Sequence, residues 1–258
     1  MAAVSPAAVA GEAAEVAADP MLDPARIQAE LDDRTAFLAG LRSTTFFDVA
    51  PASTLASDDA ALAPLAVSAV ARATFLAATD GLQAAASASS AGSTAATFAL
   101  LRAALEAASV TVWLLESDGP AVRATRLLSE VWGDIRDSDR LATALNGALE
   151  SLAAQERGWK TAHTAVFGDA DTAARQMPTS MATKVDVAAG VVADFTRVPN
   201  AGAVIRSSWQ AFGALARGRD AAFDLDDGAS AMTAGSLSLV LDVLETAASL
   251  YHVRAVGP

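Results

Sequence analysis

Arginine, glutamate and tryptophan occur at helical spacing in one otherwise apolar segment. Arg102, Glu106, Ser109 and Trp113 follow one another at intervals of four, three and four residues. Those intervals place all four side chains on one stripe of a helix. Because an unpaired buried charge costs several kcal/mol, the arginine and the glutamate need partners. A structural ion pair within the helix is the simpler interpretation, and a functional pocket is the alternative.

A second group of candidate residues, a tryptophan, a glycine and an arginine, occurs between residues 200 and 217. Trp209 borders the apolar stripe of an expected helix, whereas Gly213 and Arg217 lie on the opposite side. Glycine lowers helix propensity by about 1 kcal/mol relative to alanine, so we expect another backbone to approach Gly213 closely. A core tryptophan and a solvated arginine face would also explain the pattern. The candidate ligand or partner pocket consists of Arg102, Glu106, Trp113, Trp209 and Arg217.

The sequence carries no recognised metal or cofactor motif. Cysteine is absent, and the two histidines, His163 and His252, are far apart in the chain. The segment Asp224–Gly228 imitates a calcium loop, but Gly228 and Gly235 stand where an EF-hand needs ligands. Phosphate-binding glycine motifs and the esterase nucleophile elbow are also missing. We therefore predict neither a bound metal nor a cofactor.

One block of the chain resembles an uncharacterised family of actinobacterial all-helical proteins. Members of that family carry an arginine followed four residues later by a glutamate, which Arg102 and Glu106 match. A tryptophan-leucine-leucine sequence and two arginines follow, as they do here at Trp113-Leu114-Leu115, Arg123 and Arg126. The resemblance implies a helical fold.

A second block resembles a late motif of the same family. Trp209, Gly213 and Gly218 match it, whereas Phe212 stands at its serine position and Arg217 at its histidine position. The family has no assigned activity to carry over. If its histidine is functional, this chain lacks that function.

The same family resembles HEPN-type helical domains, some of which are ribonucleases with an arginine four to six residues before a histidine. Arg157 and His163 match that spacing. The resemblance implies that the arginine would stabilise phosphate charge and the histidine would act as acid or base. Gly158 is expected to end a helix, which would leave the pair on a loop. A HEPN-like toxin or defence ribonuclease is the alternative function.

Composition argues against nucleic-acid and membrane partners. The 258 residues include 30 acidic and 18 basic side chains, and the formal net charge is −12. Such a field repels nucleic-acid phosphates and anionic lipids. The uncharged stretch Gly81–Leu101 is rich in alanine, serine and threonine, so we do not expect it to span a membrane, and Ser87–Ser93 suits a turn between helices. We expect a cytoplasmic protein with no nucleic-acid or membrane partner.

Apolar residues recur every three to four positions along nearly the whole chain, which predicts an all-α fold. The third of the expected helices is apolar on most of its circumference and should be central. Ser43–Leu55 is the best candidate for extended chain, and we interpret it as a packed loop. Pro64 starts or kinks the second helix, and Gly133 breaks the fourth. The helices are expected at about 23–42, 58–86, 93–116, 120–157, 178–195, 200–217 and 234–254.

These elements predict one domain. Residues 23–258 should form a single bundle of about seven helices, and residues 1–22 a disordered or loosely helical tail. A polar connection at Gly168–Pro178 and an acidic loop at Asp220–Gly228 separate the last three helices. The predicted function is a non-enzymatic one, in which the bundle binds a protein partner or a second copy of itself.

Overall fold

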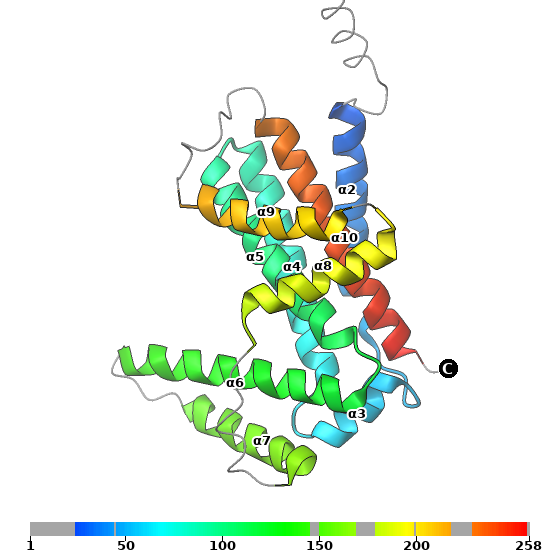
Figure 1. Ribbon diagram of the computed structural model, residues 1–258, viewed down its shortest axis with the longest axis vertical. Helices are drawn as coiled ribbons and strands as arrows, with labels where there is room; N and C mark the ends of the chain where they lie inside the picture. The colour runs from blue at the N-terminus through cyan, green and yellow to red at the C-terminus, as the bar shows by residue number, and fades with distance from the viewer. Residues whose placement is uncertain are drawn as a thin grey trace, which may run out of the picture.

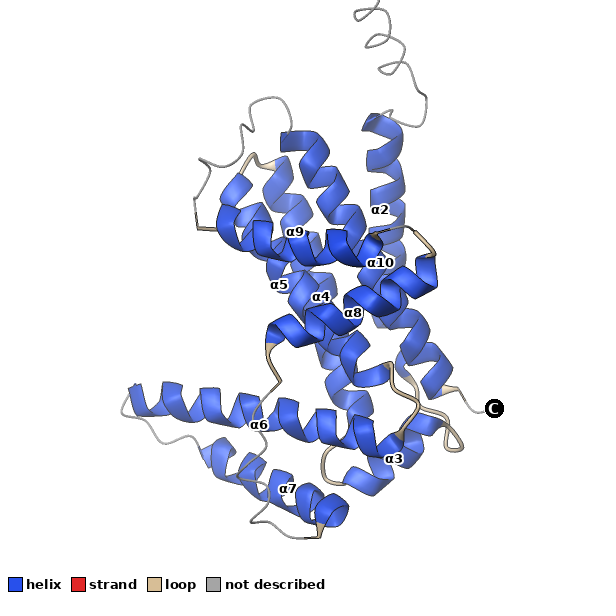
Figure 2. Cartoon of the chain, in the orientation of Figure 1, coloured by secondary structure: helices blue, strands red, loops and turns tan. Residues whose placement is uncertain are grey.

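The computed structural model describes residues 24–43, 45–144, 150–168, 179–198, 200–217 and 229–256. Within these ranges the chain forms nine α-helices, two short 3₁₀ turns and no strand (Figures 1 and 2). The predicted all-α fold is confirmed, although the described helices exceed the expected seven. The predicted tail and acidic loop, and nearly all of the polar connection, lie outside the described residues. The helices are α2 (Pro24–Gly40), α3 (Thr54–Leu62), α4 (Val67–Ser90), α5 (Thr94–Leu115), α6 (Pro120–Ala144), α7 (Glu150–Phe167), α8 (Met181–Thr196), α9 (Ala201–Leu215) and α10 (Ala229–Ala255).

Helix α5 lies at the centre of the molecule, as its apolar circumference predicts. It packs against α4, α6, α8, α9 and α10. In Figure 1, α4, α5 and α10 run along the long axis, while α8 and α9 cross in front of them. By length and composition alone, Thr94–Leu115 and Thr233–Ala255 are each apolar enough to cross a membrane. The bent pair of α3 and α4 would add a third such span if it is counted as one.

The expected second helix is two helices, α3 and α4, and the chain bends by 111° between them. Helix α3 ends at Leu62, before Pro64, because proline has no N–H to continue the ladder. The Asp59 carboxylate then accepts hydrogen bonds from the backbone N–H of Ser68, at 3.1 Å, and from the Ser68 hydroxyl. A carboxylate of α3 thereby caps the first turn of α4.

The expected fourth helix also differs from the structure. Helix α6 passes through Gly133 without a break and ends at Ala144, and Gly158 lies inside α7 instead of ending a helix. A Cβ built on Gly158 would lie 3.3 Å from Cγ of Pro64. The glycine therefore allows α7 to approach the connection between α3 and α4, a long-range contact that local sequence does not reveal.

Helices α3, α6 and α7 pack together across one end of the bundle (Figure 1). Trp159 of α7 stacks on Trp132 of α6 and donates a hydrogen bond of 2.8 Å to the carbonyl oxygen of Leu128. The predicted packed loop, Ser43–Leu55, begins at the last residue of one 3₁₀ turn (Leu41–Ser43) and contains the other (Thr45–Phe47). Its Phe47 ring is buried edge-on against Phe75 of α4.

Candidate functional site

The Arg102–Glu106 pair of α5 is completed by a tryptophan of α9. Nε of Arg102 donates to Oε1 of Glu106 at 2.9 Å, and Nε1 of Trp209 donates to the same oxygen at 2.8 Å. The guanidinium carbon of Arg102 lies 4.9 Å from the centre of the Trp209 ring. The arginine and glutamate side chains are 30% and 27% exposed. The structure therefore joins three predicted pocket residues in one cluster that solvent reaches.

Gly213 extends this cluster toward Arg217. A Cβ built on Gly213 would lie 1.7 Å from Nη1 of Arg102 and 3.5 Å from Nη1 of Arg217. The close approach that we expected from another backbone is thus made by a guanidinium. Arg217 follows the end of α9 and is exposed. Four of the five predicted pocket residues converge on the surface between α5 and α9.

Trp113, the fifth, lies elsewhere, and the structure does not bring it into this cluster. It sits eleven residues beyond Arg102 on α5, which is about 16 Å along the axis. Its ring is 3% exposed and lies 5.4 Å from the guanidinium carbon of Arg126 and 5.1 Å from Nζ of Lys184. Helical spacing predicts that Arg102 and Trp113 point to the same side of α5. It does not predict which helices pack over each of the two positions.

The charges around Trp113 are paired between helices. Arg126 bonds Glu116 at 2.7 Å, and Lys184 of α8 pairs with Glu130 of α6. Burial, followed by the proximity of Glu130, raises the pKa of Asp134 on the same helix. The Lys184–Glu130 pair links α8 to α6, and the Arg126–Glu116 pair links α6 to the end of α5.

Arg157 and His163 do not share a face of α7. Six residues along a helix rotate the side-chain direction by about 120°. Arg157 is exposed, whereas the imidazole of His163 is 1% exposed and packs 4.9 Å from the ring centres of both Trp159 and Phe167. Burial lowers the pKa of His163. The geometry is that of a core histidine.

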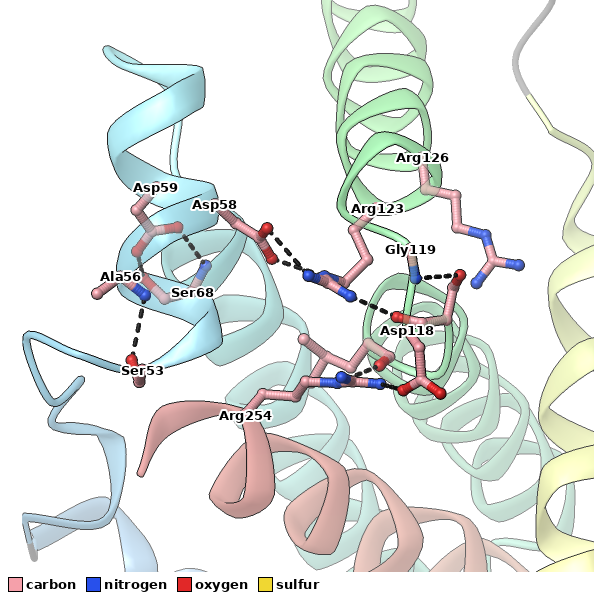
Figure 3. A network of polar contacts seen from close by, with 12 residues as sticks. Ser53, Ala56, Asp58, Asp59, Ser68, Asp118, Gly119, Arg123, Arg126 and Arg254 are labelled. Atoms are coloured by element: carbon pink, nitrogen blue, oxygen red, sulfur yellow. Dashed lines mark hydrogen bonds and ion pairs between the residues drawn. The ribbon is translucent and has the colours of Figure 1, made fainter. Parts of the chain in front are cut away.

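A buried ion pair joins α3 to α6, and Figure 3 shows it from close by. Nε and Nη2 of Arg123 bind the two carboxylate oxygens of Asp58 at 2.6 and 3.0 Å, and Nη1 binds the carbonyl oxygen of Ser117 at 2.5 Å. The Arg123 and Asp58 side chains are 1% and 3% exposed. Sequence reasoning missed this pair because 65 residues separate its members.

Arg254 of α10 extends the network to the turn before α6 (Figure 3). Its guanidinium binds the carboxylate of Asp118 at 2.6 Å and the carbonyl oxygen of Leu115 at 3.2 Å. The hydrogen bond from Arg254 lowers the pKa of Asp118. An open cavity of about 520 Å³ lies beside this network, with Asp58 and Arg123 in its wall. In this network two arginines pair with two aspartates, so no charge is left over for a ligand. We interpret the network as a structural contact between helices.

An apolar surface occurs on another side of the bundle, where α8 and α10 lie against α2 and α9. Two open grooves follow α10 there, of about 390 and 270 Å³. Phe37 and Phe195 line the larger groove and are 62% and 60% exposed. Val198 and Val204 line the smaller one and are 55% and 49% exposed. We call this surface, defined by Phe37, Phe195, Val198 and Val204, the α8–α10 face.

Comparison of the chain with protein-family models, curated proteins and solved structures finds no match. The resemblance to the actinobacterial helical family therefore stays a prediction.

Proposed function

We propose that this chain is a non-enzymatic binding protein that receives an amphipathic helix of a protein partner on its α8–α10 face. The observation that carries the proposal is the exposure of two phenylalanines and two valines beside two grooves. Large apolar side chains that gather on one exposed surface mark interaction sites, and aromatic anchors dominate binding energy.

The dimensions of the face suit a helix. The grooves border α10 from Gly235 to His252, which corresponds to about 25 Å of helix. A partner helix of about five turns has that length. Its apolar side chains, three and four residues apart, would fill the grooves, as in other helix-in-groove complexes.

Charge favours a basic partner over a second copy of this acidic chain. Asp242 and Glu245 lie on α10 where the two grooves adjoin, and their side chains are 41% and 37% exposed. Arg34 binds both carboxylates, at 2.6 and 2.7 Å, so it neutralises only part of this charge. The whole chain carries a net charge of −12, which attracts cations and repels another copy.

The test uses a fluorescent helical peptide of about five turns, with leucines on one stripe and lysines beside them. Fluorescence anisotropy should detect saturable binding to the full chain. Replacement of the anchor, Phe195→Asp, should weaken binding at least about tenfold, because it places a charge in an apolar contact. The matched control is Val122→Asp, which changes an exposed valine of α6 outside the face.

Equal peptide affinity in the wild type and the Phe195→Asp variant would contradict the proposal. Sedimentation of the chain alone tests whether a second copy of the chain, and not a different protein, occupies the α8–α10 face. A concentration-dependent dimer that Phe195→Asp abolishes would make the partner a second copy.

A further inference from the structure

We propose that Arg102 and Arg217 form a binding site for one small oxyanion, the phosphate or carboxylate group of a small molecule, on the surface between α5 and α9. The site is separate from the α8–α10 face. Its central observation is that Nη1 of Arg102 and Nη1 of Arg217 both lie close to the position of the Cβ that Gly213 lacks, at 1.7 and 3.5 Å. Two neighbouring guanidinium groups repel each other, and an anion bound to both would offset that repulsion.

The cluster has more cationic donors than carboxylate acceptors. Oε1 of Glu106 already accepts from Nε of Arg102 and from the Trp209 indole. Among the described residues, neither the Nη atoms of Arg102 nor the guanidinium of Arg217 has a hydrogen-bond partner. One negative and two positive charges leave the cluster with a local excess of +1, in a chain whose net charge is −12. This imbalance distinguishes it from the Asp58–Arg123 network.

The site is also held in shape before a ligand arrives. The Trp209 ring lies 4.9 Å from the guanidinium carbon of Arg102, Glu106 holds its Nε atom, and Nη1 lies beside Gly213 of α9. A planar guanidinium with two free nitrogens fits a phosphate or carboxylate through paired hydrogen bonds. Gly213 leaves the space for this arrangement, since any larger residue would displace Arg102.

The size and charge of the surroundings favour a compact ligand. Arg102 is 30% exposed and Arg217 is exposed, so a small anion can approach from solvent. A nucleic acid would bring many phosphates close to a strongly acidic chain and would be repelled. A single phosphate or carboxylate group matches two guanidinium groups without that penalty.

The experiment labels the chain with 5-fluorotryptophan and follows its fluorine resonances during titration. The chain has four tryptophans, and a Trp209→Phe variant assigns the resonance of interest. Inorganic phosphate and succinate are titrated separately at constant ionic strength. We expect the Trp209 resonance to shift saturably with at least one of them, and the tighter of the two identifies phosphate or carboxylate as the preferred group.

The variant Arg217→Ala should weaken that binding at least about tenfold, because it removes charge-assisted hydrogen bonds to the anion. Arg217 is exposed, so its removal leaves the core intact. The matched control, Arg140→Ala, removes an exposed arginine of α6 that pairs with Asp137, and it should bind as the wild type does.

Two results would overturn the site: no saturable shift with either anion, or the same affinity in Arg217→Ala and the wild type. The outcome is independent of the proposed function. Phe195→Asp, which disrupts the α8–α10 face, should leave anion binding unchanged, so the failure of one proposal is distinguishable from the failure of the other.

Discussion

Two glycines on α8 and α9 differ in what an added methyl group would meet. A Cβ built on Gly190 has no atom within 4 Å, whereas one built on Gly202 would lie 3.0 Å from the carbonyl oxygen of Ala189. The first site is open to solvent. The second is a backbone contact that can relax only if α8 and α9 move apart.

We therefore expect opposite effects on stability from the same substitution. Gly190→Ala should raise the free energy of unfolding by about 0.5–1 kcal/mol, through helix propensity. Gly202→Ala should lower it by about 1–3 kcal/mol, through overpacking. Urea denaturation measures both, and changes of the same sign would show that the α8–α9 contact is not tight.

His163 makes stability depend on pH. Its imidazole is buried, its Nδ1 atom has no hydrogen-bond partner among the described residues, and burial lowers its pKa. In an unfolded chain a histidine titrates near 6.5. Below that pH the unfolded chain binds the proton more readily than the folded chain does. The free energy of unfolding should therefore fall as pH drops below about 6.5 toward the folded pKa.

The variant His163→Leu removes this titration and should show a smaller loss of stability on acidification. Urea unfolding at a series of pH values between about 5.5 and 7.5 measures it. His252→Gln, which changes an exposed histidine of α10, is the control and should behave as the wild type. Parallel pH profiles for the wild type and His163→Leu would rule out a role for this imidazole.

At the scale of elements, the Asp58–Arg123 pair decides how α3 attaches to α6. Both side chains are almost completely buried, so loss of one partner leaves an unpaired charge in the core. Asp58→Ala or Arg123→Met should each lower the free energy of unfolding by about 3–5 kcal/mol. The double variant should lose less than the sum, because it leaves neither charge unpaired.

The exposed pair Arg140–Asp137 provides the comparison for urea denaturation. Arg140→Ala should change stability by no more than about 0.5 kcal/mol, since solvent screens both charges. If loss of either pair lowered the free energy of unfolding by the same amount, the buried Asp58–Arg123 pair would have no special role in attaching α3 to α6.

Sequence patterns predicted individual helices better than the contacts between them. The positions of α5, α8 and α9 follow from apolar spacing and from turn residues such as Gly119, which are local signals. The break between α3 and α4 depends on Pro64 and on the Asp59–Ser68 contact, which links two helices. The sequence therefore indicated Pro64 but not the 111° bend.

The candidate site was predictable to the same extent. Arg102 and Glu106 could be selected because they interrupt an otherwise apolar helix, and Trp209 and Arg217 because they accompany a glycine in the expected helix at 200–217. Their convergence could not be predicted, because it depends on the packing of α9 across α5. Pairs such as Asp58–Arg123 carry no local signal, since an aspartate in the second turn of a short helix is ordinary on a surface.

At the scale of the whole molecule, the apolar character of α5 and α10 has two physical explanations, a membrane or a helical bundle. Within the described structure, 67% of the α5 window and 56% of the α10 window are buried by other helices. Arg102 and Glu106 lie near the middle of α5, where a charge costs about 2.5–3.5 kcal/mol in a bilayer. We infer that burial by neighbouring helices, and not lipid, explains this composition.

We therefore predict that the purified chain stays soluble without detergent and does not float with phosphatidylcholine vesicles in a density gradient. A double variant, Arg102→Leu with Glu106→Leu, makes α5 more apolar and separates the two explanations. If the neighbouring helices keep α5 out of lipid, this variant should also stay at the bottom of the gradient, because α4, α8, α9 and α10 still cover the helix. Flotation of the variant alone would mean that its two charges exclude α5 from lipid. Flotation of the wild type would mean that the bundle opens to insert α5 or α10.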